Sequence, residues 1–281
     1  MRYRLTLLLA GLMFVMTMPA TAIENEKLFS HYQKLLEKNL TEQVTEEGGL
    51  VTAFDYQAAL QDPSIGNLLD KQRQRLAAVD LTKLEGRDES IAFWLNAYNF
   101  SMIEHILSDR PNSELVSSVW DYGGRVNPFR KHIFERPLFT IGGEDYSLDQ
   151  MEKDILLGED YAQRGWKDAR VHFAVNCASV GCPPLRSAVY TAENLEDLLA
   201  ENTRRALNTD YHLKAEGDKL YVTELFKWYE KDFEEAAGSV QQFIRESADP
   251  SVAERAANTS EIGFIDYDWA LNKPSNFPEL R

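Results

Sequence analysis

The sequence predicts an α+β fold in which helices surround a small, mostly antiparallel sheet. The 281-residue chain is 44% hydrophobic and 11% aromatic, which is enough apolar material for a packed core. Apolar residues recur at helical spacing in the first part of the chain, whereas short β-type segments gather in the later part. Helices and hairpins of mixed kind separate these segments, and this irregular order favours α+β over a regular α/β alternation.

The first residues have the pattern of a secretory signal peptide. Arg2 and Arg4 precede an apolar run over residues 5–18, and Ala-Thr-Ala at residues 20–22 supplies the small residues of a cleavage site. The apolar run is short for a membrane span. We therefore expect cleavage after Ala22, a periplasmic or secreted protein, and no stable membrane span after cleavage. An uncleaved N-terminal anchor is the alternative.

The N-terminal part of the chain is predicted to be helical. Apolar residues at helical spacing predict three helices, over residues 27–38, 55–60 and 65–79. Pro63 separates the last two of these helices, and the polar residues 41–49 are turn-like. We therefore expect residues 23–50 to form an N-terminal helical extension and residues 51–281 to form a single α+β domain.

The longest expected helix lies near residues 89–108. Apolar residues cover nearly all of its sides, so we expect it to be buried at the centre of the domain. Asn96 and Asn99 would then be buried too, and a buried amide without hydrogen-bond partners costs on the order of a few kcal/mol. Two interpretations stay open: these amides orient a catalytic group or line a pocket, or they hold the backbone of a neighbouring loop.

The later segments predict hairpins, helices and short strands. The expected elements are a hairpin over residues 137–146, a helix from Ser147, strands over residues 171–177 and 262–269, helices over residues 192–208 and 223–233, and a hairpin over residues 212–222. On the helix over residues 223–233, we assign Trp228 and Tyr229 to packing and interpret Asp232 as a solvated or paired acid.

The charge of the chain excludes some partners. Its formal net charge is −15, and a strongly acidic surface repels phosphate groups. We therefore expect no nucleic acid and no anionic membrane as a partner. A small molecule or a peptide is the ligand class that remains.

The most informative segment runs from Arg170 to Leu185. It contains both cysteines of the chain and changes from an alternating apolar pattern into a Gly-Cys-Pro-Pro turn. A disulfide between Cys177 and Cys182 suits an exported protein, but their spacing does not fit a C-x-x-C redox motif. A zinc site would need more histidine or cysteine ligands than the sequence groups together, so we expect no metal and no cofactor. The remaining interpretation is a thiol nucleophile at Cys177.

His172 is the first candidate for the base that would activate this thiol. In a regular strand, His172 and Cys177 would lie on opposite faces, so their contact requires a bulge or an early end of the strand. Otherwise His172 is a hydrogen-bonded core residue. His105 and His132 are the alternative partners.

Five segments together resemble the family catalogued as domain of unknown function 547. They are AFWLNAYN at residues 92–99, SLDQMEKDIL at 147–156, HFAVNCASVGCPPL at 172–185, FKWYEKDF at 226–233 and IDYDWALN at 265–272. This resemblance implies an α+β domain from about residue 54 to residue 272. The family usually has Ile-Glu-His where this chain has Met151-Glu152-Lys153, so the glutamate is kept and the histidine is replaced. Within the resemblance, Glu152 orients a histidine or binds an amine; from the residues alone, it caps a helix.

These segments define one candidate site and two classes of function. The candidate catalytic residues are Cys177, His172 and Glu152, and the candidate binding residues are Asn96, Tyr98, Asn99, Asn176 and Cys182. The first class is an exported cysteine-dependent hydrolase or acyl-transferase, distantly similar in its parts to papain-like and transglutaminase enzymes. The second class is a non-enzymatic envelope domain that binds a ligand or assembles with a partner, with a structural Cys177–Cys182 pair.

Overall fold

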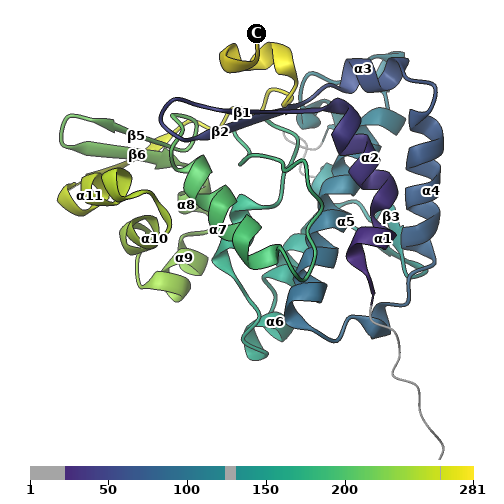
Figure 1. Cartoon of the computed structure of the whole chain (residues 1–281), viewed down its shortest axis with the longest axis horizontal. Helices are drawn as coiled ribbons and strands as arrows, with labels where there is room; N and C mark the ends of the chain where they lie inside the picture. The colour runs from purple at the N-terminus through teal and green to yellow at the C-terminus, as the bar shows by residue number, and fades with distance from the viewer. Residues whose placement is uncertain (1–22, 124–130, 260) are drawn as a thin grey trace, which may run out of the picture.

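A computed structural model describes residues 23–123, 131–259 and 261–281 (Figure 1). The predicted signal peptide, residues 1–22, lies outside the described residues. The α+β class is confirmed, since helices predominate and the strands are short.

The helices and strands have the following bounds. The helices are α1 (Asn25–Leu28), α2 (Ser30–Asn39), α3 (Tyr56–Gln61), α4 (Ile65–Ala77), α5 (Arg87–Ser108), α6 (Glu159–Gln163), α7 (Leu195–Ala206), α8 (Leu225–Trp228), α9 (Glu230–Ala237), α10 (Val240–Ser247) and α11 (Pro250–Asn258). The strands are β1 (Leu40–Val44), β2 (Leu50–Phe54), β3 (Phe139–Ile141), β4 (Glu144–Tyr146), β5 (Leu213–Glu216), β6 (Lys219–Thr223) and β7 (Glu261–Ile265).

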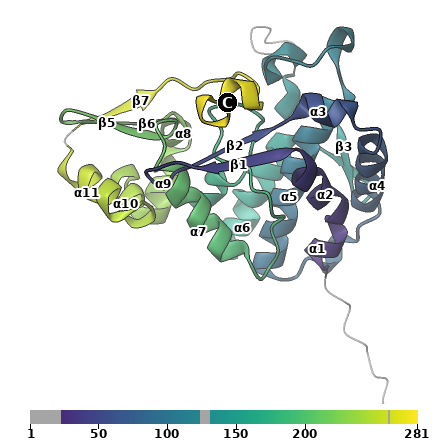
Figure 2. The ribbon, with the colours of Figure 1, turned by 45° about the horizontal axis from the view of Figure 1, so that its top comes forward.

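The described strands form three separate small sheets, where one sheet was expected. The pairs β1–β2 and β3–β4 are antiparallel hairpins, and the third sheet has the order β5–β6–β7. In this third sheet, β5 and β6 are antiparallel, whereas β6 and β7 are parallel. The prediction of mostly antiparallel pairing is therefore confirmed. Each hairpin packs in a different part of the fold, so no continuous sheet forms (Figures 1 and 2).

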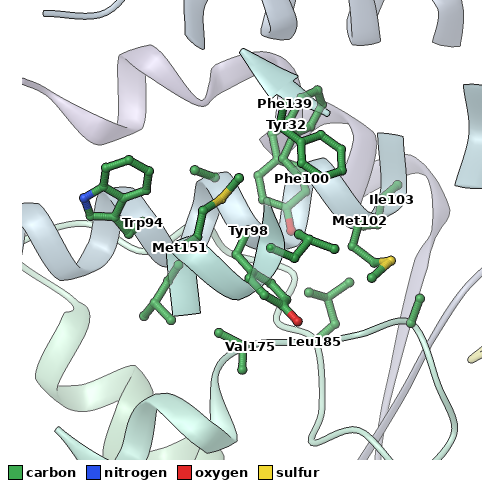
Figure 3. Close-up of a cluster of buried hydrophobic side chains, with 14 of the residues drawn as sticks. Tyr32, Trp94, Tyr98, Phe100, Met102, Ile103, Phe139, Met151, Val175 and Leu185 are labelled. Atoms are coloured by element: carbon green, nitrogen blue, oxygen red, sulfur yellow. The ribbon is translucent and has the colours of Figure 1, made fainter. Parts of the chain in front are cut away.

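Helix α5 is the centre of the larger hydrophobic core, as the sequence predicts. Every residue from Ser90 to Leu107 on this helix is buried, and the acidic Asp88 and Glu89 stabilise its N-terminal turn. Figure 3 shows the ring of Tyr98 on α5 close to Val175 and Leu185. The loop that carries both cysteines is therefore packed directly against the central helix.

A second, smaller core lies on the other side of the molecule. Helices α9 to α11 and strands β5 to β7 occupy this side, whereas α1 to α5 occupy the opposite one (Figures 1 and 2). The rings of Phe173, Phe226, Phe233 and Phe243 fill the second core. Ala169 and Phe173 belong to this core, whereas Val171 and Ala174 belong to the larger one, so this segment lies between the two cores. The cysteine loop follows directly after it.

The N-terminal segment is part of the same folded unit. Phe29, Tyr32 and Leu35 of this segment are fully or almost fully buried in the core that surrounds α5. Residues 41–49, predicted to be a turn, contain most of β1, which pairs along its whole length with β2. The expected boundary at residue 50 therefore divides a hairpin. Strand β1 is difficult to predict from the sequence, because it has few apolar residues and its polar side chains face solvent.

The strand predicted over residues 171–177 does not form. Residues Ala169–Phe173 are a 3-10 helix, and the chain after it is irregular. Asp168 starts this helix, because its side chain accepts a hydrogen bond of 3.0 Å from the backbone N–H of Arg170. The apolar residues suggest a strand because the segment is buried between the two cores. The expected placement of His172 and Cys177 on opposite faces of a strand therefore does not apply.

Other predicted elements hold with changed ends. The helix expected from Ser147 is a π-helix over Gln150–Leu156, and the helix expected over residues 223–233 is divided into α8 and α9 at Tyr229. Strand β7 ends at Ile265, before the predicted end. Across the described ranges, no helix combines the length and the apolar character that a membrane crossing would require.

Candidate functional site

A pocket of about 260 Å³ lies beside the cysteine loop. Among the described residues, seven Tyr, Trp and Phe side chains line it: Tyr98, Trp120, Phe134, Trp228, Tyr229, Tyr267 and Trp269. Polar side chains also reach it, and they include the predicted residues Glu152, His172, Cys177 and Cys182. An apolar wall with a few grouped polar residues is the usual character of a small-molecule site.

A tight turn presents Cys177 to this pocket. The side-chain oxygen of Asn176 accepts a hydrogen bond of 2.9 Å from the backbone N–H of Ala178, and its amide nitrogen donates one of 2.9 Å to the carbonyl oxygen of Pro183. Asn272 donates a further hydrogen bond of 3.0 Å to the same Asn176 oxygen. Ala178 has a φ of 62°, in the left-handed region that a residue with a side chain rarely adopts. The structure thus holds the Cys177 turn in an uncommon conformation.

The two asparagines of α5 hold backbone segments behind the pocket. Asn99 accepts a hydrogen bond of 2.8 Å from the N–H of Asn176 and donates one of 3.0 Å to the carbonyl oxygen of Ala174. Asn96 makes the equivalent pair of bonds with the backbone of Tyr190, at 2.7 and 2.9 Å. These contacts match the interpretation that the amides hold a loop.

Of the five candidate binding residues, the structure brings two to the pocket. Tyr98 and Cys182 line it, whereas the side chains of Asn96, Asn99 and Asn176 are used up in backbone hydrogen bonds and do not belong to its described lining. These three asparagines therefore support the backbone that surrounds the pocket. This arrangement does not favour direct contact between their side chains and a ligand.

The sulfur of Cys177 is surrounded by hydrogen-bonding groups. The Tyr267 hydroxyl lies 3.1 Å from it and the Ser179 hydroxyl 3.8 Å from it. Burial opposes ionisation of this thiol, but hydrogen bonds from Cys182, Tyr267 and Ser179 together lower its pKa. The thiol of Cys177, which faces the pocket, therefore ionises more readily than an ordinary thiol.

Cys182 lies behind Cys177 as its partner. Its sulfur accepts hydrogen bonds from the backbone N–H of Cys177, at 3.0 Å, and from that of Ser179, at 3.4 Å. The Tyr267 hydroxyl is also 3.1 Å away. Burial raises the pKa of Cys182 well above its usual value, and the neighbouring Cys177 sulfur raises it further. Both cysteines carry free thiols, so the structure does not contain the disulfide that the sequence left open.

His172 is held on the same pocket by a carboxylate. Its Nε2 lies 2.8 Å from an oxygen of Asp232, and its ring stacks on Tyr229 with 3.9 Å between the ring centres. Hydrogen bonds from His172 and Lys167 outweigh the effect of burial and lower the pKa of Asp232 to about 2. An ionised Asp232 assigns the ring hydrogen to Nε2. The other nitrogen, Nδ1, then has a free lone pair, and it has no hydrogen-bond partner among the described residues.

Glu152 faces this free nitrogen at a longer distance. One of its oxygens is 3.9 Å from Nδ1 of His172, and the residue is only 6% exposed. Burial raises the pKa of Glu152, although the proximity of His172 and Lys153 opposes this rise. Glu152 therefore keeps its proton to a higher pH than an ordinary glutamate. The sequence assigned the orientation of the histidine to Glu152, but the residue in hydrogen-bond contact with the ring is Asp232.

The alternative histidines lie elsewhere. His105 lies about two turns along α5 from Tyr98, packs against Tyr122 and does not belong to the described lining of the pocket. His132 stands at the rim of the pocket, where its ligand nitrogen and the carboxylates of Glu135 and Asp149 lie within 4.8 Å of one another. This group could hold a divalent cation, but Asp149 is already paired with Lys153 at 2.8 Å.

Sequence reasoning missed several residues of the site. The sequence predicts only a solvated or paired acid at Asp232 and packing roles for Trp228 and Tyr229, and it does not assign these residues to the site. The segment Asp266-Tyr267-Asp268-Trp269 carried a usable signal, because its alternation of acids and aromatic rings indicates that both rings share one side. Tyr267 and Trp269 do lie together, with 4.5 Å between their ring centres, and both line the pocket.

The comparison with known proteins concerns the middle of the chain. Residues 81–206 match the model of a family described as "Protein of unknown function, DUF547". No curated protein and no solved structure matches the chain. The matched residues include Glu152, His172, Cys177 and Cys182, whereas Asp232 and Tyr267 lie beyond them. Over residues 81–206, the chain is therefore similar to the DUF547 family.

Proposed function

We propose that this protein is a thiol-dependent hydrolase or acyl-transferase in which Cys177 is the nucleophile. One observation carries the proposal: a single pocket contains a thiol with hydrogen-bond donors around its sulfur and a histidine with one nitrogen on a carboxylate and the other unpaired. Thiol enzymes of the acyl-transfer class combine these parts, a nucleophile, a base and a residue that orients the base.

The thiolate is formed by its own surroundings. The Tyr267 hydroxyl, 3.1 Å from the Cys177 sulfur, can donate its hydrogen to the thiolate and stabilise the charge, so ionisation does not require direct contact with an imidazole. The thiolate attacks the carbonyl carbon of an ester, thioester or amide. The S–C bond forms, the leaving group departs with its bonding electron pair, and the acyl group stays on Cys177.

His172 and Asp232 serve the proton transfers of this cycle. Nδ1 of His172, which has a free lone pair, takes up the proton that the Cys177 thiol loses and passes it to the leaving group, while Asp232 holds Nε2. In the second half of the cycle, Nδ1 removes a proton from the water or the acceptor that attacks the acyl group and returns it to the Cys177 sulfur as the S–C bond breaks. Glu152, with its raised pKa, is a second proton donor on the same side of the pocket. Water as the acceptor gives a hydrolase, and an amine, alcohol or thiol gives an acyl-transferase.

The pocket favours a small apolar acyl group. Its volume of about 260 Å³ holds a short side chain or acyl chain, and aromatic rings form much of its wall. The ring of Trp228 is 43% exposed, so an apolar surface continues to the mouth. A small acylated molecule or the end of a peptide fits this site.

The test is a burst experiment with p-nitrophenyl acetate. We expect one equivalent of nitrophenol to be released quickly and the intact mass to increase by one acetyl group, located on the peptide that contains Cys177. Cys177→Ser and His172→Gln should lose the burst, whereas His31→Gln, a control histidine on α2 outside the pocket, should keep it. A burst of wild-type size in Cys177→Ser would overturn the proposal.

The aromatic wall also supports a second candidate, a ligand-binding domain without chemistry. Trp228, Tyr267 and Trp269 form a continuous group of rings beside the cysteines. If Trp228→Ala abolishes the binding of an aromatic probe and no ester or thioester acylates Cys177, this second candidate replaces the first.

A further inference from the structure

We propose that Cys177 and Cys182 are a peroxide-sensitive thiol pair: a hydroperoxide oxidises Cys177, and Cys182 then closes a disulfide that blocks the pocket nucleophile. The chemistry of the pair is independent of the proposed acyl transfer. Only the accompanying loss of activity rests on the proposed function.

The two sulfurs are in position to react with each other. Each lies 3.1 Å from the same Tyr267 hydroxyl, and the Cys182 thiol hydrogen-bonds the Cys177 sulfur. The loop between them closes on itself, because the backbone N–H of Cys182 donates a hydrogen bond of 3.0 Å to the carbonyl oxygen of Ser179. A disulfide therefore needs a local shift of two side chains and no rearrangement of the two cores.

The environment gives the two thiols different roles. Cys177 is the more exposed of the two, and Cys182 is 7% exposed behind it. The hydrogen bonds that lower the pKa of Cys177 favour the thiolate, which is the form that attacks a peroxide. Burial raises the pKa of Cys182, so this thiol is less reactive towards the peroxide and acts in the second step, as the resolving thiol that attacks the oxidised Cys177. A low-pKa accessible thiol beside a resolving thiol is the arrangement of redox-sensitive cysteine pairs.

The reaction balances in two steps. The Cys177 thiolate attacks one peroxide oxygen: an S–O bond forms, the O–O bond breaks, and the other oxygen leaves as water or an alcohol after taking up a proton. The Cys182 sulfur, after losing its proton, then attacks the Cys177 sulfur. An S–S bond forms, the S–O bond breaks, and the second oxygen leaves as water. The two thiols are oxidised by two electrons and one hydroperoxide is reduced; a dithiol reductant reverses the change.

Hydrogen peroxide on the purified protein tests the pair without any substrate. After a limited dose, we expect the wild-type protein to lose the mass of two hydrogens and to show no alkylatable thiol after denaturation. Peptide mapping should find Cys177 joined to Cys182, and dithiothreitol should restore both thiols. Burst activity, measured in parallel, should fall and recover with the thiols.

Two variants separate the roles of the sulfurs. In Cys182→Ser, dimedone should trap a sulfenic acid on Cys177, and longer treatment should give a sulfinic acid that dithiothreitol does not reduce. In Cys177→Ser, the remaining Cys182 should stay unoxidised at the dose that fully converts the wild type. Thermal unfolding of each variant confirms that it is folded.

The proposal is overturned if the wild-type protein gains oxygen on Cys177 without the Cys177–Cys182 cross-link. It is equally overturned if Cys182 in Cys177→Ser reacts as fast as the wild-type pair. If the disulfide forms reversibly but no ester acylates the protein, the redox pair stands and the proposed acyl transfer fails.

Discussion

Replacement of Asn99 tests how the central helix supports the cysteine turn. Asn99→Leu keeps the branching and the number of heavy atoms of the side chain but removes two hydrogen bonds, to the N–H of Asn176 and to the carbonyl oxygen of Ala174. Asn99 is only 2% exposed, so water does not easily replace these bonds. The variant therefore leaves two buried backbone groups, one donor and one acceptor, without partners.

The magnitude follows from these two groups. An unpaired buried donor or acceptor costs roughly 1–3 kcal/mol, so two cost ~4 kcal/mol at the middle of the range. Burial of the leucine side chain returns ~2 kcal/mol. We therefore expect Asn99→Leu to lower the free energy of unfolding by ~2 kcal/mol, measured by urea denaturation.

Asn96→Leu is the matched control. It removes the same two kinds of bond from the same helix, but its partner is the backbone of Tyr190. Both variants should be destabilised by a similar amount, whereas only Asn99→Leu should change the alkylation rate of Cys177. A loss below about 0.5 kcal/mol for Asn99→Leu, or equal changes in alkylation rate for both variants, would show that Asn99 does not support the cysteine turn.

Three further predictions concern single side chains. Tyr267→Phe removes a hydroxyl that contacts both sulfurs, so the pH at the midpoint of the Cys177 alkylation profile should rise. An unchanged midpoint would show that Tyr267 does not lower the pKa of Cys177. The pKa of Asp232 is about 2 against its ordinary 3.8, so its contribution to stability is present above pH 3.8 and is lost as the pH falls towards 2. In Asp232→Asn, the urea midpoint of unfolding should depend less on pH over this range. Burial lowers the pKa of His212 from 6.5 to about 4, so the unfolded chain takes up a proton first and stability should fall as the pH drops from 6.5 to 4. His212→Gln should reduce that dependence, and an identical pH profile would contradict the assignment.

Much of the fold could be predicted because it depends on local periodicity. The central helix is apolar on nearly all sides, and only a buried position suits such a sequence. The failures have a physical cause too. Strand β1 is mostly polar, and residues 171–177 have the composition of a strand because they are packed between two cores. Periodicity does not distinguish a buried strand from buried irregular chain.

The site could be predicted only where its residues lie in recognisable segments. Cys177, His172 and Glu152 were singled out by motif, and the structure places all three on one pocket. Asp232 and Tyr267 were missed, because their importance depends on contacts with residues 60 and 90 positions away in the chain. Tertiary structure alone brings such groups together, so no local pattern marks Asp232 as the partner of a histidine.

The ionisation of Cys177 is the most direct test of the account. Alkylation of the wild-type protein by iodoacetamide, measured across pH with the modified cysteine identified by mass spectrometry, gives the pKa of the thiol. The hydrogen bonds from Cys182, Tyr267 and Ser179 predict that Cys177 reacts first, with a midpoint below the ordinary thiol pKa of 9.0. A midpoint at or above 9.0, or modification of Cys182 before Cys177, would contradict the assignment of Cys177 as the nucleophile.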